Sequence, residues 1–127
     1  MMVRGIRGAT TVEHNEADEI LRATTELLTQ IVAENGTVPE DICSVFVTTT
    51  EDITATFPAR AIRQMPGWEL VPLMCALEIP VQPSLPKCIR LMVHVNTEKR
   101  QNEIRHVYLN EAKILRPDIA GQSASAK

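Results

Sequence analysis

The fold is decided by one stretch, Cys88-Ile89-Arg90-Leu91-Met92-Val93-His94-Val95, whose side chains alternate as they do along a β-strand. We expect its aliphatic residues to face the core, and Arg90 to lie on the other face between Cys88 and Met92. An arginine among such neighbours needs an anion, because a buried unpaired charge costs several kcal/mol. The stretch itself contains no carboxylate. The anion is therefore either a distant Glu or Asp of the fold or a ligand.

Further strands and helices are predicted on both sides of this stretch. Residues 2–12 predict an opening strand, in which Gly5 and Gly8 indicate a bulge or the close approach of another group. An amphipathic helix follows, capped by Asn15 and ended by Asn35-Gly36. The other elements we expect are a turn of helix at 39–41, a strand at 44–50, a short helix over 58–65, loops with at most one short strand at 66–86, a short helix within 100–110 and a brief strand near 113–115.

The order of these elements predicts an α+β fold, in which a mixed β-sheet carries helices on one face. A single layer of helices leaves the other face of the sheet open, so we expect another subunit to cover it. The length suits one domain, which we place at residues 1–118. Residues 119–127 have the composition of a flexible C-terminal tail.

Composition argues against several classes of protein. The net charge is −3 and the aromatic residues are two Phe, one Trp and one Tyr, whereas a nucleic-acid-binding protein usually has a basic surface and stacking rings. The chain has no apolar run long enough to span a membrane, and its first residues lack the apolar stretch of a signal peptide. Its three cysteines show no CxxC spacing and read as free thiols. We therefore expect a cytoplasmic protein that binds neither nucleic acid nor a membrane.

The sequence lacks the signatures of metal and covalent catalysis. The three histidines, His14, His94 and His106, show no HxxxH or HExxH spacing, so we expect no metal site. There is no nucleophile motif such as GxSxG, although a cysteine and a histidine could still meet in space. What remains suits the binding and electrostatic stabilisation of a small dianion. This set comprises Arg7, Arg60, Arg63, Arg90 and Arg116, with Glu78, Cys75 and Tyr108 as hydrogen-bonding groups.

Five segments of the chain resemble the monofunctional AroH-class chorismate mutases. They are Arg4-Gly5-Ile6-Arg7-Gly8-Ala9-Thr10-Thr11, Phe57-Pro58-Ala59-Arg60-Ala61-Ile62-Arg63, Cys88-Ile89-Arg90, Ile104-Arg105-His106-Val107-Tyr108-Leu109 and Leu115-Arg116-Pro117-Asp118. The resemblance implies a homotrimeric pseudo-α/β barrel with active sites in the clefts between subunits. It also implies the intramolecular Claisen rearrangement of chorismate to prephenate, on the way to phenylalanine and tyrosine, without a metal or cofactor.

The same resemblance assigns roles to five catalytic residues. Arg90 would lie against the ether oxygen and a carboxylate of the substrate, where it stabilises the negative charge that grows as the C–O bond breaks. Arg7 would bind a substrate carboxylate, and Tyr108 would donate a hydrogen bond to the side-chain carboxylate. Glu78, with Cys75 beside it, would accept from the substrate hydroxyl and balance the positive charge on the ring. Holding chorismate in the reactive chair-like pose would supply part of the rate.

Other residues are implied to bind the substrate without taking part in the bond changes. They are Phe57 and Ala59 as an apolar wall, Arg60 and Arg63 at a cationic entrance, Met74, and Leu115 and Arg116 in a C-terminal segment that closes over the site. Two residues depart from the family's pattern, Leu77 and Pro80, and both flank Glu78. These two residues therefore affect the expected geometry around the substrate hydroxyl.

Two other kinds of protein would fit part of this pattern. One is a non-catalytic trimer of similar scaffold that binds small anions, and the other is a structural oligomerisation domain. A binding protein needs carboxylate clamps but has no need for a cation over an ether oxygen opposite a glutamate. The joint presence of Arg7, Glu78, Arg90, Tyr108 and Arg116 therefore favours the enzyme.

Overall fold

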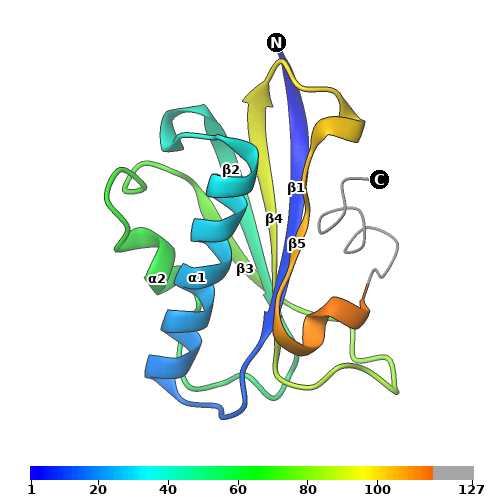
Figure 1. Ribbon diagram of the computed structural model, residues 1–127. Helices are drawn as coiled ribbons and strands as arrows, with labels where there is room; N and C mark the ends of the chain where they lie inside the picture. Colours follow the sequence, from blue (N-terminus) through cyan, green and yellow to red (C-terminus); the bar gives the residue numbers. More distant parts are fainter. Residues whose placement is uncertain (116–127) are drawn as a thin grey trace.

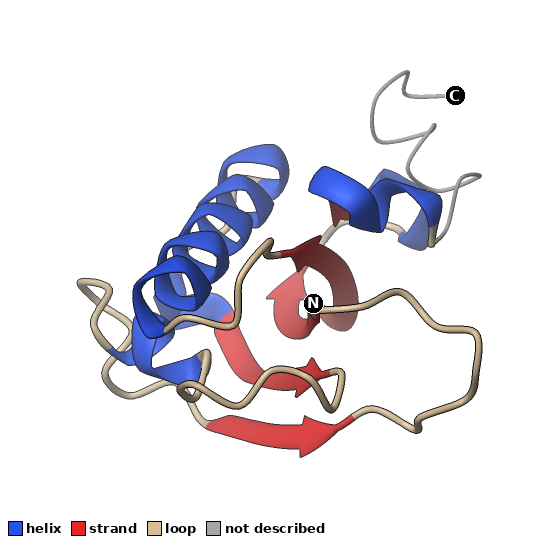
Figure 2. Ribbon diagram, turned by 90° about the horizontal axis from the view of Figure 1, so that it is seen from below, coloured by secondary structure: helices blue, strands red, loops and turns tan. Residues whose placement is uncertain are grey.

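The computed structural model describes residues 1–115 of the chain as one five-stranded mixed sheet with two helices. Helices α1 (Ala17–Asn35) and α2 (Ala59–Arg63) lie on the same side of the sheet (Figures 1 and 2). This arrangement confirms the predicted α+β fold. The strand order is β3-β2-β4-β1-β5, and the strands are β1 (Met2–Thr11), β2 (Ile42–Thr49), β3 (Leu73–Leu77), β4 (Cys88–Thr97) and β5 (Val107–Tyr108).

Strand β4 is the central strand and pairs antiparallel with both β1 and β2. Its aliphatic residues, Ile89, Leu91, Val93 and Val95, are buried under α1 and α2. Arg90 on the alternate face is only half-buried. The alternation predicted for residues 88–95 is therefore confirmed.

Helix α1 packs closely on β1. The side chains of Leu27, Leu28 and Ile31 have no exposed surface. A Cβ atom added to Gly8 of β1 would lie 2.6 Å from Cδ1 of Ile31, so a side chain at this position would push the helix away. The close approach predicted at Gly8 is therefore the approach of this helix.

The end of α1 agrees with the prediction, but its beginning does not. Gly36 follows the helix in the left-handed conformation, with φ of 61°, as a glycine C-cap requires. The predicted cap at Asn15 is wrong, because the residue at the N-cap is Glu16. Asn15 instead accepts hydrogen bonds from the backbone N–H groups of Thr54 (2.9 Å) and Ala55 (3.0 Å).

The middle of the chain follows the sequence pattern, whereas residues 100–115 do not. Four predictions are confirmed here. The turn at 39–41 is η1 (Pro39–Asp41), the strand at 44–50 is β2, and the helix over 58–65 is α2. The single strand in the proline-rich stretch is β3. The predicted helix within 100–110 is wrong, because only η2 (Gln101–Glu103) is helical and β5 then pairs with Gly8 and Ala9. The strand near 113–115 is also wrong, because η3 (Asn110–Ile114) occupies it. In both places a partner distant in sequence overrides the local pattern.

Arg116 and the predicted tail at 119–127 lie outside the described residues. Within residues 1–115, no helix has both the length and the apolar character needed to cross a membrane.

Candidate active site

Four of the five predicted catalytic residues, all except Cys75, lie on or beside the face of the sheet away from α1 and α2, which we call the open face. Backbone register places one row of residues across all five strands, and residues opposite one another share a face. This row is Ala76, Thr48, Arg90, Ala9 and Tyr108. Arg90 therefore lies at the centre of the sheet, with Tyr108 two strands away.

Arg90 has an acidic neighbour from its own chain. Its Nε lies 3.5 Å from Oε2 of Glu78, the residue that follows β3. The Thr48 hydroxyl donates a hydrogen bond to the same carboxylate. Both side chains of the ion pair remain partly accessible, at 34% for Arg90 and 22% for Glu78. Nε of Arg90 is buried yet makes no hydrogen bond with the described residues, so the pair leaves it only partly satisfied.

A cavity of about 200 Å³ lies beside this pair. The loop of residues 78–87 forms one wall of this cavity. This loop projects away from α1 and α2 (Figures 1 and 2). The lining residues are Thr50, Glu51, Asp52, Glu78, Ile79, Pro80, Gln82, Ser84, Leu85, Pro86 and Arg90. The sequence left open whether a residue of the fold or a ligand faces Arg90, and the structure shows an acidic residue and a cavity together.

Arg7 and Tyr108 border this region on the open face. Arg7 is opposite Met92, one row along from Arg90, and its backbone N–H donates to Nδ1 of His106 (2.9 Å). Tyr108 is buried in a small cluster with Ala9 and Cys88. Other members of that cluster are Ala112, Leu85 and Leu115. The predicted closing residue Leu115 therefore packs against the cluster that contains Tyr108.

A second cavity, of about 730 Å³, lies on the other side of β3. Phe57, Arg60 and Cys75 line it together with Leu77. Cys75 is opposite Val47, a fully buried core residue, so its side chain is on the helix side of the sheet rather than on the open face. Within one chain two groups of predicted site residues therefore line different cavities, Glu78 and Arg90 the first and Phe57, Arg60 and Cys75 the second.

Besides Leu115, three predicted substrate-binding residues line neither of these cavities. Ala59 is buried in the core of the chain, and Arg63 is exposed at the end of α2. Met74 is on the open face opposite Phe46, with 63% of its surface exposed. The sequence pattern alone does not show which of these residues line which cavity, because that depends on the face of the sheet or helix that each residue occupies.

The thiol of Cys88, two residues before Arg90 on the same face, is poorly suited to act as a nucleophile. Burial raises the pKa of Cys88 to about 11, although the charge of Arg90 opposes the shift. A thiol with this pKa is protonated at neutral pH, and the thiolate is the reactive form. Cys88 is therefore a poor candidate for the cysteine nucleophile that the sequence left open.

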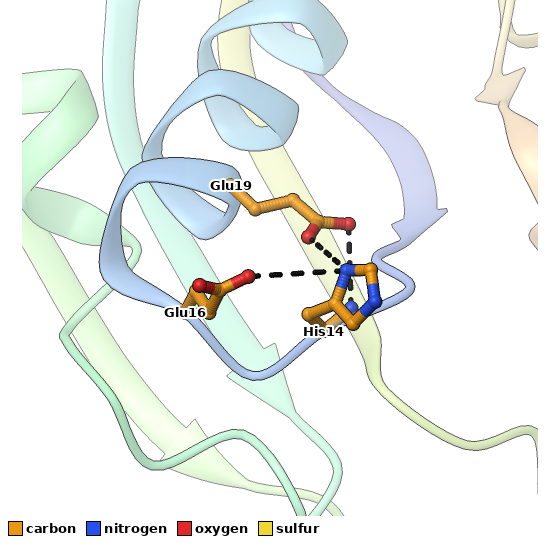
Figure 3. A group of neighbouring side chains, drawn as sticks. All are labelled: His14, Glu16 and Glu19. Carbon is orange, nitrogen blue, oxygen red and sulfur yellow. Dashed lines mark hydrogen bonds and ion pairs between the residues drawn. The ribbon is translucent and has the colours of Figure 1, made fainter.

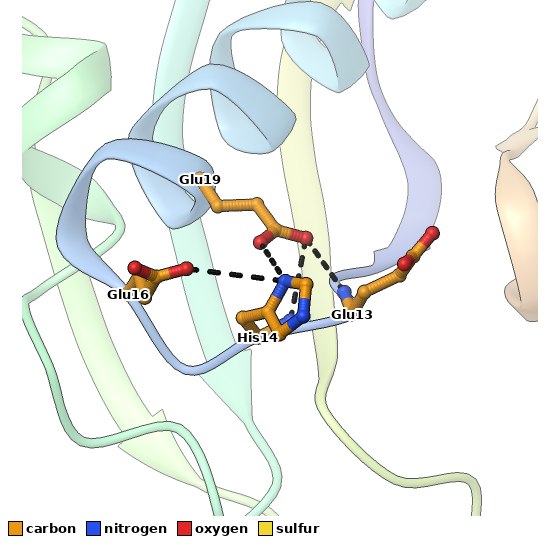
Figure 4. A network of polar contacts seen from close by, with 4 residues as sticks. All are labelled: Glu13, His14, Glu16 and Glu19. Carbon is orange, nitrogen blue, oxygen red and sulfur yellow. Dashed lines mark hydrogen bonds and ion pairs between the residues drawn. The ribbon is translucent and has the colours of Figure 1, made fainter.

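A separate polar cluster occupies the turn between β1 and α1. His14 Nδ1 lies 3.1 Å from Glu19 and 3.9 Å from Glu16 (Figure 3). One nitrogen or oxygen atom of each residue that could bind a metal lies within 4.8 Å of the others. The HxxxH and HExxH motifs do not detect this grouping. Glu19 already accepts the backbone N–H groups of Glu13 (2.6 Å) and His14 (3.4 Å) (Figure 4). The bond from Glu13 lowers the pKa of Glu19, so we interpret the cluster as a brace of this turn.

The fold and the open face define an electrostatic site. A fixed guanidinium, a carboxylate and a small cavity can stabilise opposite charges that develop on one bound molecule. The described residues near Arg90 offer no activated thiol for covalent chemistry. These features suit a site that binds a small polar molecule and stabilises charge on it.

Known proteins are similar to this chain over nearly its whole length. The family model described as "Chorismate mutase type I" matches residues 3–119. The chorismate mutase AroH of Bacillus subtilis is 49% identical over 120 residues, 94% of each chain. That of Thermus thermophilus is 50% identical over 119 residues, which are 93% of this chain and 97% of the relative. A solved chorismate mutase from Clostridium thermocellum is 52% identical, has a TM-score of 0.85 and matches 87% of this chain and 98% of its own.

The chain therefore belongs to the type I chorismate mutase family. Its enzymatic class is accordingly that of an isomerase, as the resemblance of the five sequence segments implied.

Proposed function

We propose that this chain converts chorismate to prephenate in sites shared between neighbouring subunits of a homotrimer. Arg7, Glu78, Arg90 and Tyr108 of one subunit supply the open-face part of each site. Phe57, Arg60, Cys75 and the adjoining residues of another subunit supply the second part, from the cavity on the other side of β3.

The Arg90–Glu78 pair is the observation that carries this proposal. As the C–O bond of chorismate breaks, negative charge grows on the ether oxygen and positive charge grows on the ring. A guanidinium and a carboxylate held 3.5 Å apart suit these two charges, because neither has to move during the reaction. Losing one such preorganised donor typically costs about 3–4 kcal/mol of transition-state stabilisation.

The charge balance of the cavity favours a contribution from a second subunit. Three carboxylates line the cavity, those of Glu51, Asp52 and Glu78. Arg90 supplies the one guanidinium among its described lining residues. The carboxylates alone would repel a dicarboxylate substrate, so further cations are needed. Arg7 lies on the same face, and Arg60 of a neighbouring subunit would add another positive charge.

Exposed apolar residues on the open face also favour assembly. Phe46 and Met74 are neighbours on this face, with 46% and 63% of their surfaces exposed, and Met92 is opposite Phe46. Contiguous apolar side chains of this size usually mark a contact surface. A second subunit placed here would cover them and bring another copy of the Arg60 cavity toward Arg90.

The proposal extends to the setting of the reaction. The product would feed the synthesis of phenylalanine and tyrosine in the cytoplasm. The chemistry needs neither a metal nor an organic cofactor, because bonds break and form within one molecule and the charges are met by side chains.

Turnover of chorismate by the wild type and an Arg90→Ala variant tests the proposal. We expect the purified protein to consume chorismate in buffer that contains a chelator and no added cofactor. We expect Arg90→Ala to lower kcat a few hundredfold, about 3–4 kcal/mol, while the oligomer measured by light scattering stays the same. Near-wild-type kcat in this variant would contradict the role of Arg90. A folded oligomer that binds a bicyclic transition-state analogue without any turnover would favour the anion-binding alternative.

A further inference from the structure

Asp52 is the centre of a set of hydrogen bonds at the edge of the Arg90 cavity. Its carboxylate accepts the backbone N–H of Lys87 through both oxygens, at 2.9 and 3.1 Å. The same carboxylate accepts the hydroxyl of Thr50 at 2.6 Å. So far Asp52 has entered only as one of the carboxylates that line this cavity.

Thr50 extends this set to the first residue of β4. Its hydroxyl accepts the backbone N–H of Cys88 (2.9 Å), and its own N–H donates to the Cys88 carbonyl (3.1 Å). One hydroxyl therefore joins the Asp52 carboxylate to the start of the strand that carries Arg90. Arg90 itself is only two residues further along.

Lys87 is held in a conformation that needs such support. Its φ is 48°, in the left-handed region that residues other than glycine seldom adopt. Its N–H is bound by Asp52, and its carbonyl accepts the N–H of Val12 at 3.0 Å. These two bonds fix the turn through which the chain enters β4.

The loop of residues 78–87 is consequently tied to the end of β2 at both of its ends. At its start, the N–H of Glu78 donates to the Thr49 carbonyl at 2.8 Å. At its end, Asp52 and Thr50 hold Lys87 and Cys88. Because Glu78 begins this loop and Arg90 follows it, the distance between their side chains depends on both ties.

We propose that Asp52, acting with Thr50, is a positioning residue that sets the geometry of the Arg90–Glu78 pair for the rearrangement. This inference rests on the proposed function. Asp52 acts through the backbone of Lys87 and Cys88 and does not itself bind the substrate. Its two oxygens bind a backbone N–H and a hydroxyl, so in this role it acts by fixing the backbone.

The test compares variants that remove the tie with variants that keep it. Asp52→Ala removes the acceptor, whereas Asp52→Asn keeps one oxygen that can accept both bonds. Glu103→Ala is the matched control, because Glu103 also accepts a backbone N–H, that of Arg100 (2.7 Å), beyond the opposite end of β4. For each folded oligomer, kcat and KM for chorismate are measured alongside hydrogen exchange at the Lys87 amide.

We expect Asp52→Ala to speed exchange at Lys87 and to lower kcat on the order of tenfold to a hundredfold, with a smaller change in KM, because a misplaced catalytic group loses transition-state stabilisation. We expect Asp52→Asn and Glu103→Ala to stay near the wild-type kcat. Faster exchange at Lys87 with unchanged kcat would show a purely structural role and overturn the proposal. A wild-type protein without turnover would overturn the proposed function together with this inference, whereas wild-type turnover with unaltered Asp52→Ala kcat overturns this inference alone.

A second pair of variants decides the matter if Asp52→Ala does not fold. Thr50→Val removes the hydroxyl at nearly constant shape, and Thr50→Ser keeps it. A lower kcat in Thr50→Val than in Thr50→Ser supports the proposal, and equal kcat values overturn it.

Discussion

Cys88 precedes Arg90 by two residues on the open face, and its thiol makes the fold sensitive to alkali. Burial raises its pKa to about 11 from the ordinary 9.0, because the folded chain disfavours the thiolate. A raised pKa stabilises the fold fully below pH 9, and this stabilisation is lost as the pH rises from 9 toward 11. We expect the Tm of the wild type to fall more steeply over this range than that of Cys88→Ala. Cys75→Ala is the control, because Cys75 is exposed, and its slope should match the wild type. Equal slopes in all three proteins would contradict the prediction.

Single residues differ in how well the sequence reveals them. Arg90 could be selected because a cation within an alternating apolar strand is unusual. Asp52 could not, because its role depends on a backbone N–H that is 35 residues away in the chain. Backbone partners leave no mark in the amino-acid pattern. The sequence therefore identifies the charged groups that face the cavity more readily than those that hold its backbone in place.

At the scale of elements, the contact between β1 and α1 depends on the missing side chain of Gly8. A methyl group there would lie 2.6 Å from Cδ1 of Ile31 and 3.1 Å from Cδ1 of Leu27, and both side chains are fully buried. We expect Gly8→Ala to lower the free energy of unfolding by about 1–3 kcal/mol, the usual cost of overpacking. Urea denaturation followed by circular dichroism measures the loss.

Two further variants test the cause of that loss. Ile31→Val removes the clashing methyl group, so the double variant Gly8→Ala/Ile31→Val should be more stable than the sum of the single effects predicts. Gly5→Ala is the matched control in the same strand, because its new methyl group would meet only Sδ of Met92, at 3.2 Å. A loss in Gly5→Ala as large as that in Gly8→Ala would count against the packing argument.

Asn35 joins the end of α1 to the segment that leads into β5. This buried side chain donates to the carbonyls of Ile31 (2.8 Å) and Arg105 (2.9 Å), and it accepts the N–H of Arg105 (2.8 Å). We expect Asn35→Ala to cost on the order of 2 kcal/mol, because backbone groups lose their partners in a part-buried place. Asn35→Asp should cost at least as much at neutral pH, since a carboxylate would face two carbonyl oxygens.

Thermal unfolding and hydrogen exchange at the Arg105 amide check this prediction. Asn102→Ala is the control, because Asn102 is exposed in η2. If Asn35→Ala has the same Tm as Asn102→Ala, the hydrogen bonds of Asn35 do not stabilise the contact between α1 and the segment that leads into β5.

The sequence predicts elements well where their pattern is long and local, as in α1 and β4. It fails at residues 100–115, where β5 has two residues and owes its existence to pairing with Gly8 and Ala9. No periodic pattern can be detected over two residues. Asn110, with φ of 56°, then turns the chain out of the sheet into η3, which contradicts the strand suggested by Ile114 and Leu115. The missed elements are those that tertiary contacts impose.

At the scale of the whole molecule, one chain carries two partial sites. The groups around Arg90 and around Arg60 lie on opposite sides of β3, and each lines its own cavity. The resemblance of the sequence implied sites in the clefts between subunits, but the sequence did not show which predicted residues line which cavity. The extent of the domain at residues 1–118 and the trimer both remain predictions. A division between subunits can be tested without knowing the assembly in detail.

Mixed oligomers of two inactive variants should regain activity if each site takes residues from two subunits. Arg90→Ala damages the open-face part, and the double variant Phe57→Asp/Arg60→Glu damages the other part by placing anions where a dicarboxylate binds. In a cyclic assembly mixed at random from equal amounts, roughly a quarter of the sites pair two undamaged parts. We expect co-refolded or co-expressed mixtures to recover about that share of wild-type kcat per site, whereas each variant alone stays inactive. Simple mixing of the folded proteins without subunit exchange is the control. If both parts of a site came from the same chain, each chain would keep its own defect and co-refolding would restore nothing.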